Sequence, residues 1–383
     1  MTRWIFTGGR VVTPAGVLPG AAIALDGDRI AAIEVAIDVA GADAAIDLDG
    51  GWLLPGFVDT QVNGGGGVLF NTDMSVEGIA AIAAAHRRYG TTALLPTLIS
   101  DTPAQVAAAL DAVDAAIAAG VPGIVGIHVE GPFLNPVRKG IHDPAMFRRL
   151  DAATIALLTA PRRGRVMVTL APEQCDGADI AALAAAGVRV SAGHSDATYE
   201  QAMAGFAAGV SGVTHLYNAM SPLGHRAPGM VGAALDAGSA WCGLIADGVH
   251  VHPAALRVAV RALPADKAML VTDAMPSVGA REKDFTLYGR RIHVADGVCR
   301  GEDGTLAGSD LDMARAVANM VREVGVAPAA AAAMAATHPA AFLGLSHERG
   351  ALAPGLRADW VWLDADWRVR GVWIGGERVV HAA

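Results

Sequence analysis

The sequence lacks several features that would assign it to common protein classes. Its 383 residues include three cysteines, Cys175, Cys242 and Cys299, which lie far apart and form no C-x-x-C pair. This spacing argues against a disulfide framework and a thiolate zinc site, and it fits a protein of the reducing cytoplasm. The first residues, MTRWIFTGGRVV, contain no uninterrupted apolar segment followed by a small-residue cleavage site, so we expect no signal peptide.

Charged residues are also scarce. They make up 17% of the chain, and the formal net charge is -9. Because no basic stripe is available to neutralise phosphates, nucleic acid and an anionic membrane surface are not expected as partners. The apolar run AAAAAMAATHPAAFLGL is interrupted by His338 and Pro339 before it could cross a bilayer, which indicates buried helices of a soluble protein.

The central part of the chain repeats a pattern of a short apolar run, a polar or glycine-rich loop and a helix-period segment. This pattern is typical of βα units in a parallel sheet. Eight such runs occur, at residues 53–63, 91–99, 123–131, 165–173, 188–194, 212–218, 241–248 and 267–275. Eight strands close a (β/α)8 TIM-like barrel. A doubly wound open sheet would give the same local pattern, but no GxGxxG fingerprint follows an early strand, so the α/β barrel is favoured.

The two ends of the chain alternate in the manner of short antiparallel strands. We expect them to form one small β-sandwich domain, residues 1–52 and 347–383, beside a barrel domain of residues 53–346. The segment FTLYGRRIHVADGVCR predicts a strand-like insertion after the eighth run, and helices within 310–345 are expected to close the barrel. Thr102 with Pro103 and Thr198 with Gln201 predict two helix starts.

Acidic and imidazole side chains stand at the ends of several predicted strands, where barrels of this kind hold their chemistry. Glu130 ends the third run and His194 the fifth, while His215 and Asp273 lie near the ends of the sixth and eighth. Each alone has an ordinary explanation, as a hydrogen-bonded histidine or an aspartate that caps a helix. Four such residues at equivalent strand ends indicate an active site.

These residue types suit a metal-dependent hydrolase. Two imidazoles and one carboxylate form a ligand set for catalytic Zn²⁺ that leaves one coordination position open, and the same set suits Fe²⁺. Asp273 would then be free to accept a proton from water and pass it to a leaving nitrogen, as general base and then general acid.

Seven segments resemble the amidohydrolase superfamily and, more closely, the family of N-acetylglucosamine-6-phosphate deacetylases. They cover nearly the whole chain in the family's order, and THLYNAM, GHRAPG and TLAGS are the most specific to the deacetylases. The resemblance implies hydrolysis of the acetamide of N-acetylglucosamine 6-phosphate to glucosamine 6-phosphate and acetate. The segments are LPGFVDTQVNG, HVEGPFLNPVRKGIH, SAGHSDATYEQ, VTHLYNAMSPLGHRAPG, DGVHVHP, VTDAMPSVG and GTLAGSDLDM.

The resemblance also implies a role for each matching residue. The metal ligands would be Glu130, His194 and His215. Asp273 would activate the water and protonate the departing amine, and His142 would polarise the acetyl carbonyl. Arg226 and His250 would bind the phosphate, and because family members are usually homodimers, Arg226 acts either in its own subunit or across the interface. The other implied substrate contacts are Gln61, Gly131, Asn218, Ala219, Leu306, Ala307 and Gly308.

The first run departs from the superfamily's usual pattern. Gln61 and Asn63, on one strand face, stand where two-metal members carry His-x-His. Amide oxygens bind zinc far less well than imidazole, and a Gln-x-Asn pair also occurs in a mononuclear branch of the deacetylases. We therefore predict one metal ion per subunit, with Gln61 hydrogen-bonded to the water or substrate. His128, on the same strand face as Glu130, is expected to point into the barrel, either to support the site or to pack there, rather than to bind metal.

Other functions stay open at this point. The substrate could be N-acetylgalactosamine 6-phosphate, since the orientation of one hydroxyl distinguishes the two sugars. A D-aminoacylase or a dihydroorotase would commonly carry His-x-His on the first strand and often a bridging lysine, and the sequence has neither. A catalytically silent barrel kept as a scaffold should have lost a metal ligand or the acid–base residue, yet all four are present.

Overall fold

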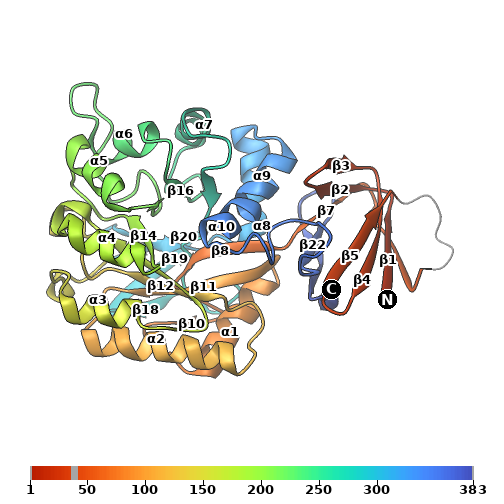
Figure 1. Ribbon diagram of the computed structural model, residues 1–383, viewed down its shortest axis with the longest axis horizontal. Helices are drawn as coiled ribbons and strands as arrows, with labels where there is room; N and C mark the ends of the chain where they lie inside the picture. Colours follow the sequence, from red (N-terminus) through yellow and green to blue (C-terminus); the bar gives the residue numbers. More distant parts are fainter. Residues whose placement is uncertain (1, 36–41, 382–383) are drawn as a thin grey trace.

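A barrel and a smaller stack of β-sheets make up the computed structural model of the chain (Figure 1). The structure describes residues 2–35 and 42–381. The predicted sandwich domain, 1–52 and 347–383, includes residues 1, 36–41 and 382–383, which lie outside the described part.

Eight parallel strands form the barrel in the order β17-β16-β15-β14-β13-β12-β11-β8. Strands β8, β11 and β12 are buried along their whole length, which explains why the runs are apolar without alternation. Each predicted run contains one barrel strand, so the predicted barrel is confirmed. The strands are β8 (Phe57–Val62), β11 (Thr91–Ile99), β12 (Gly126–Glu130), β13 (Arg165–Leu170), β14 (Arg189–Ala192), β15 (Gly212–Val213), β16 (Trp241–Leu244) and β17 (Ala268–Leu270).

The first and last barrel strands, β8 and β17, meet without a regular ladder. Beyond the end of β17, the backbone N–H of Asp273 donates to the carbonyl of Gln61 at 3.0 Å. The Asp59 carboxylate lies in the same seam, where Oδ2 accepts the Thr272 hydroxyl at 2.6 Å and Oδ1 accepts the Thr272 N–H at 3.3 Å. Asp59 is 0% exposed, and burial raises the pKa of this carboxyl to about 7 although the Thr272 bonds oppose the shift.

Helices cover the outside of the barrel (Figure 1). The predicted caps are present: the Thr102 hydroxyl accepts the Gln105 N–H, and Thr198 with Gln201 forms a capping box. No helix in the described residues is long and apolar enough to cross a membrane. The helices are α1 (Val76–Arg87), α2 (Pro103–Ala118), α3 (Ala152–Thr159), α4 (Gly177–Ala185), α5 (Tyr199–Ala208), α6 (Gly229–Asp236), α7 (Pro253–Ala262), α8 (Met313–Asn319), α9 (Pro328–Ala335) and α10 (Thr337–Phe342), with a π-helical turn at Met320–Val324 and 3-10 turns at Pro136–Arg138, Pro144–Met146 and Pro172–Gln174.

Antiparallel strands are inserted at two places in the barrel. A short hairpin follows the first barrel strand and consists of β9 (Gly64–Gly65) and β10 (Val68–Leu69). The insertion predicted after the eighth run is a four-stranded meander, and α8, α9 and α10 follow it as expected. Its strands are β18 (Phe285–Leu287), β19 (Arg290–Ala295), β20 (Val298–Gly301) and β21 (Leu306–Ser309).

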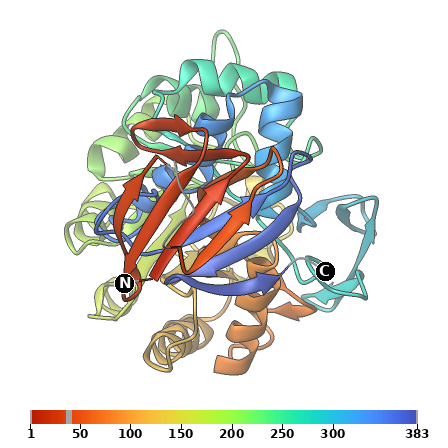
Figure 2. The ribbon, with the colours of Figure 1, turned by 90° about the vertical axis from the view of Figure 1, so that its right-hand side faces the viewer.

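Both ends of the chain build the small sandwich, as predicted, and Figure 2 views it from the front. The prediction that these strands are antiparallel is wrong for two pairs: β1 pairs with β6, and β2 with β7, in parallel. One sheet contains β1 (Thr2–Thr7), β4 (Ala21–Asp26), β5 (Arg29–Glu34) and β6 (Ala44–Asp47), and the other contains β2 (Arg10–Thr13), β3 (Gly16–Leu18), β7 (Trp52–Pro55), β22 (Trp360–Leu363), β23 (Val369–Ile374) and β24 (Glu377–His381).

The first predicted run, residues 53–63, is two strands rather than one. Its beginning is β7, which pairs antiparallel with β22 in the sandwich, and its end is the barrel strand β8. Gly56 separates them, and a Cβ there would lie 2.3 Å from the Thr92 hydroxyl oxygen. The residues that flank Gly56, 53–55 and 57–58, are buried and apolar, so the sequence shows no polar break between the two strands. The exact domain limits stay a prediction.

Three aromatic side chains fill the centre of the sandwich. Phe6 on β1 meets Trp360 on β22 with ring centroids 5.9 Å apart, and Trp373 on β23 lies 6.2 Å from Phe6. All three are 0% exposed. The two sheets are therefore held together by aromatic packing contributed by both ends of the chain.

We predict that Trp373→Ala destabilises the protein by about 3–5 kcal/mol, because it leaves a cavity between the two sheets. Urea denaturation followed by circular dichroism should show the loss as a lower midpoint. Val17→Ala is the control, since Val17 is 45% exposed, and it should move the midpoint little. Equal midpoints for Trp373→Ala and the parent protein would contradict this account of the sandwich core.

Candidate active site

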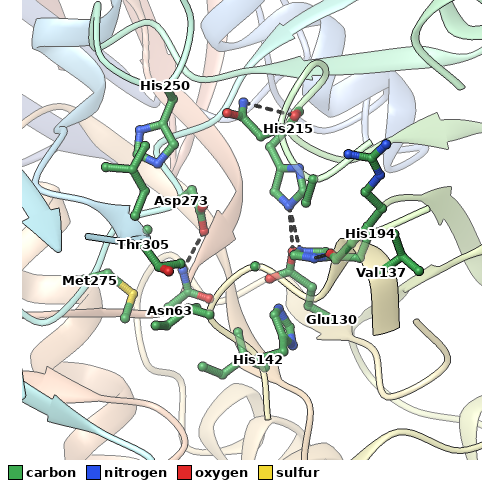
Figure 3. A pocket seen from close by; sticks show the side chains of 18 residues that line it. Asn63, Glu130, Val137, His142, His194, His215, His250, Asp273, Met275 and Thr305 are labelled. Atoms are coloured by element: carbon green, nitrogen blue, oxygen red, sulfur yellow. Dashed lines mark hydrogen bonds and ion pairs between the residues drawn. The ribbon is translucent and has the colours of Figure 1, made fainter. Parts of the chain in front are cut away.

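A cavity of about 360 Å³ opens at the carboxyl ends of the barrel strands, the face on which parallel barrels carry their functional groups (Figure 3). Most of the site residues predicted from the sequence line it. They are Glu130, His142, His194, His215, Asn218, Ala219, His250, Asp273, Leu306 and Gly308. Four other predicted residues do not belong to this lining in the described part of the chain, namely Gln61, Gly131, Arg226 and Ala307.

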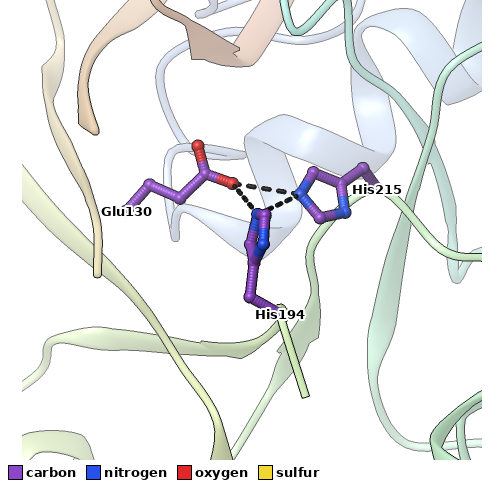
Figure 4. Close-up of side chains that lie close together, drawn as sticks. All are labelled: Glu130, His194 and His215. Carbon is purple, nitrogen blue, oxygen red and sulfur yellow. Dashed lines mark hydrogen bonds and ion pairs between the residues drawn. The ribbon is translucent and has the colours of Figure 1, made fainter. Parts of the chain in front are cut away.

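Glu130, His194 and His215 converge on one point (Figure 4). The Oε1 atom of Glu130 lies 3.0 Å from Nε2 of His215 and 3.3 Å from Nε2 of His194, and the two Nε2 atoms are 3.1 Å apart. All three residues are buried. In a tetrahedral site with bonds of about 2.0–2.1 Å, neighbouring ligand atoms would be separated by about 3.3 Å. The three residues could therefore hold a metal ion.

The hydrogen bonding of His194 supports this use. Its Nδ1 lies 2.8 Å from the backbone carbonyl oxygen of Arg138, which can only accept. Nδ1 therefore carries a proton, and Nε2 is the ring nitrogen that faces the cluster and would offer its lone pair to a metal. The Nδ1 atom of His215 is buried and has no hydrogen-bond partner among the described residues, so only Nε2 of that ring faces a polar group.

The charges of the cluster also favour a bound cation. Burial opposes the charge on Glu130, but hydrogen bonds from His194 and His215 hold the pKa of Glu130 well below its usual range. Burial likewise disfavours the cation of His215, yet the bond to Glu130 and its charge raise the pKa of His215. The buried negative charge of Glu130 thus needs positive charge beside it. Protons on the two rings can supply that charge, and so could a divalent cation.

Asp273 lies on the opposite side of the cavity and is held by two amides. Its Oδ1 accepts Nδ2–H of Asn63 at 2.7 Å and Nε2–H of Gln61 at 3.1 Å, and the Gln61 Nε2 also donates to Glu130 at 3.1 Å. Burial and the charge of Glu130 raise the pKa of Asp273 to about 6, which places its protonation near neutral pH. A carboxyl poised in this way suits proton transfer.

The amides at positions 61 and 63 thus bind protein carboxylates through their nitrogen atoms. The expected contact of Gln61 with water or substrate stays a prediction. What the structure adds is a bridge: Gln61 places an N–H donor between Glu130 and Asp273, two acids that would otherwise repel each other across the site.

His142 is buried beside the cluster, with its ring centroid 4.4 Å from that of His194. The backbone N–H of Ser100 points to Nδ1 of His142 at 3.3 Å, and the Ser100 hydroxyl lies 2.8 Å from the same atom. Because a backbone N–H can only donate, Nδ1 accepts and the ring proton is on Nε2. Burial and the charge of His194 lower the pKa of His142 to about 3, so the ring is neutral with one Nε2–H donor.

The two predicted phosphate ligands differ in position. His250 lines the cavity near Asp273 (Figure 3). Arg226 is exposed in the segment between β15 and α6, outside the cavity lining of the described chain. Asn218, whose Nδ2 donates to the His215 carbonyl at 3.2 Å, and Ala219 line the cavity at the start of this segment.

Residues 306–308 belong to strand β21 rather than to a loop. Alternation along the strand places Leu306 and Gly308 in the cavity wall, whereas Ala307 is 0% exposed and packs in the core beneath the meander. Gly308 has φ +56, and a Cβ there would lie 2.7 Å from the Asp273 carbonyl oxygen. Glycine is required at this position for β21 to approach Asp273.

Several site residues have left-handed backbone conformations, which side chains other than glycine rarely adopt. His194 has φ 48, His215 has φ 36, Ala219 has φ 49 and Asp273 has φ 52. Such strain is found where the surrounding structure holds a residue for function. Here the sharp turns at the strand ends direct these side chains into the cavity.

His128 supports the site as expected, from a layer of hydroxyl groups inside the barrel. Its Nδ1 lies 3.2 Å from the Thr97 hydroxyl and its Nε2 lies 2.7 Å from the Thr169 hydroxyl. The Thr169 hydroxyl in turn lies 2.7 Å from that of Thr214, next to His215. Both ring nitrogens are occupied, so His128 is unavailable as a metal ligand.

Two carboxylates that support the site were missed in the sequence. Glu173 accepts Nδ2–H of Asn135 at 2.9 Å, the Ser195 hydroxyl at 2.7 Å and the Asp196 N–H at 2.7 Å, and so joins the loops that carry His142 and His194. Asp247 contacts His250. Glu173 ends the fourth predicted run and Asp247 lies near the end of the seventh, so the signal that selected Glu130 could have found both.

Comparison with known proteins identifies the family. Residues 52–379 match the profile of the Amidohydrolase family. An N-acetylgalactosamine-6-phosphate deacetylase of Shewanella sp. (strain ANA-3) is 44% identical over 335 residues, which cover 88% of this chain and 85% of the relative. An N-acetylglucosamine-6-phosphate deacetylase of Mus musculus is 38% identical over 357 residues, which cover 89% and 86%.

A solved structure extends the likeness to the whole fold. The crystal structure of N-acetylglucosamine-6-phosphate deacetylase from Pasteurella multocida has a TM-score of 0.95 with this chain at 34% identity, and the match covers 99% of this chain and 100% of that one. The resemblance inferred from the sequence is confirmed. The chain belongs to the amidohydrolase family, in the group whose matched members are named N-acetylglucosamine- or N-acetylgalactosamine-6-phosphate deacetylases.

Proposed function

We propose that this chain hydrolyses the acetamide of N-acetyl-D-glucosamine 6-phosphate to D-glucosamine 6-phosphate and acetate, in amino-sugar catabolism. The observation that carries the proposal is the placement of the Glu130, His194 and His215 cluster, neutral His142 and poised Asp273 around one cavity. The names of the relatives supply the substrate class.

Glu130, His194 and His215 would hold one divalent metal ion per subunit, for which we propose Zn²⁺ first and Fe²⁺ as the alternative. When bound, the ion supplies a Lewis acid that makes water more acidic and polarises the acetyl carbonyl. No second site is proposed at Gln61 and Asn63, because their amide nitrogens donate to Asp273.

Asp273 carries the proton in the proposed reaction. It accepts one proton from the attacking water as the new C–O bond forms, and it delivers that proton to nitrogen as the amide C–N bond breaks. Its raised pKa allows both states near neutral pH. The Gln61 and Asn63 donors keep Oδ1 fixed, so Oδ2 is the oxygen that we assign to proton transfer.

His142 assists at the acetyl carbonyl. Its Nε2–H can donate a hydrogen bond to the oxygen on which negative charge develops. The Ser100 N–H fixes this tautomer, and the ring stays neutral, so it donates without giving up a full proton.

His250 and Arg226 would bind the 6-phosphate, His250 from inside the cavity and Arg226 from an exposed loop. We propose that the enzyme is a cytoplasmic homodimer in which Arg226 enters the partner's cavity. The position of Arg226 outside its own cavity lining favours action across the interface over action within the subunit.

N-acetylgalactosamine 6-phosphate is the second candidate substrate, because the relative with 44% identity is named for it. Acetate release should be measured with both sugar phosphates and with both unphosphorylated sugars, using metal-loaded protein. Turnover of the phosphorylated sugars supports the proposal, and the ratio of kcat/KM decides between the two. Absence of turnover on either, with metal bound, would overturn it.

We predict that Asp273→Asn lowers kcat at least about 100-fold while the metal content stays unchanged, because the change removes the proton carrier without removing a ligand. Elemental analysis of the same sample used for kinetics checks both parts. Near-parental kcat would show that the proton is carried by another group.

A second prediction concerns metal stoichiometry. Protein purified without added metal should hold about one ion per chain, and His215→Ala should hold far less, because a tetrahedral site loses affinity steeply with one ligand. His225→Ala is the matched control, since His225 is exposed and should leave the metal content unchanged. Two tightly held ions per chain in the parent protein would contradict the one-metal proposal.

A third prediction concerns Arg226. Arg226→Ala should raise KM for the phosphorylated sugar about 10-fold or more and leave kcat/KM for the unphosphorylated sugar nearly unchanged, because a charged hydrogen bond to phosphate is lost. Equal losses on both sugars would instead indicate a structural role.

Mixed dimers distinguish action across the interface from action within one subunit. When an Arg226→Ala subunit is paired with an Asp273→Asn subunit, only the first has a working Asp273. If Arg226 acts across the interface, this site receives Arg226 from its partner and keeps a near-parental KM. A raised KM in the mixed dimer would show that Arg226 acts in its own subunit.

A further inference from the structure

A buried acid stands directly behind His250. Asp247 lies in the loop after β16, and the side chains of Asp247 and His250 are 5% and 7% exposed. Oδ2 of Asp247 is 2.6 Å from Nδ1 of His250. Oδ1 accepts the backbone N–H groups of Val249 and His250, each at 2.8 Å. One carboxylate therefore holds both the backbone and the ring of His250.

This contact decides how His250 can act. A carboxylate has no hydrogen to donate, so Nδ1 of His250 must carry a proton and donate it to Asp247. A neutral ring would then have only a lone pair at Nε2, which cannot donate to a phosphate oxygen. To donate to an anionic group through Nε2, the ring needs a second proton there, and the Asp247 carboxylate at 2.6 Å from Nδ1 balances the charge which that proton brings.

The ionisation of Asp247 fits the same arrangement. Burial opposes its negative charge, but the hydrogen bond from His250 and the positive charge of that ring lower the pKa of Asp247. No other cationic side chain bonds to Asp247 in the described chain. Asp247 and His250 thus behave as one buried pair, with the ring between the carboxylate and the cavity that it lines.

We propose that Asp247 is a positioning residue for substrate recognition: it holds the ring of His250 with Nε2 free for the cavity, and it supplies the negative charge that pairs with the ring when Nε2–H binds the 6-phosphate. This inference rests on the proposed function, and it adds a residue that acts only through His250. With Asp247 behind it, His250 would act as a charge-assisted donor, and such donors form stronger hydrogen bonds to phosphate than a neutral ring does.

Asp247→Asn tests the proposal with little change in shape. The asparagine Oδ1 can still accept the N–H groups of Val249 and His250, whereas its Nδ2 presents hydrogens to Nδ1 and removes the negative charge. We expect KM for the phosphorylated sugar to rise about 10-fold or more, kcat to change less than about threefold, and kcat/KM for the unphosphorylated sugar to stay within about twofold. Asp266→Asn, on a 68% exposed side chain, is the control and should change neither constant.

A double-mutant cycle asks whether Asp247 acts through His250. In the His250→Gln background, adding Asp247→Asn should raise KM less than about twofold further, because the ring that Asp247 positions is already absent. Additive increases in KM would overturn the proposal, since a general structural role would persist without the ring. Equal losses on phosphorylated and unphosphorylated sugars would overturn it as well.

Two further measurements separate the possible failures. Nitrogen-15 NMR of the histidine rings should show a His250 Nδ1–H signal shifted by its carboxylate, and Asp247→Asn should remove that shift whatever the substrate is. Parental turnover with an unchanged KM in Asp247→Asn would overturn this inference alone, whereas absence of parental turnover would overturn the proposed function with it. If Asp247→Asn fails to fold, Asp247→Glu decides: an intermediate KM supports the proposal, and an unchanged KM overturns it.

Discussion

The seam between β8 and β17 is the constraint on which the rest of the site depends. These two strands share no regular ladder, and the barrel closes through a few bonds: Asp273 N–H to Gln61, Asn63 N–H to Ala274 at 2.9 Å, and the buried Asp59 carboxylate. The same bonds bring the ends of β8 and β17 together, so Gln61, Asn63 and Asp273 become neighbours. The bonds that close the barrel are therefore also the bonds that place Asp273, the proposed acid–base residue, in the site.

That closure places two acids, Glu130 and Asp273, in one buried site, where their charges oppose each other. Gln61 relieves the conflict by donating to both carboxylates, and Asn63 donates a second hydrogen bond to Asp273. Imidazole at these positions would offer lone pairs for a second cation instead. The amides Gln61 and Asn63 thus suit the proposed site, with one cation and one carboxyl of raised pKa.

The sequence could predict what depends on local periodicity. Eight buried runs indicated the barrel, and acidic or imidazole residues at their ends indicated Glu130, His194, His215 and Asp273. Periodicity could not separate β7 from β8, because both are buried and Gly56 is their only break. It also could not show which atom of Gln61 forms a hydrogen bond, since its partner Asp273 lies 212 residues away in sequence. Nor could it show which tautomer His142 adopts, since Ser100 lies 42 residues away. Such contacts exist only after the barrel has closed.

Two carboxylates support the loops that carry histidines of this site. Glu173 joins the loops that carry His142 and His194, while Asp247 holds the ring of His250. The left-handed conformations of His194, His215 and Asp273 are unfavourable by about 1–3 kcal/mol each in isolation. Hydrogen bonds from the ends of neighbouring strands must offset that cost. A parallel barrel gathers all its carboxyl ends on one face, so these partners come from the ends of other strands: Gln61 of β8 donates to Asp273, and His194 donates to the Arg138 carbonyl in the loop after β12.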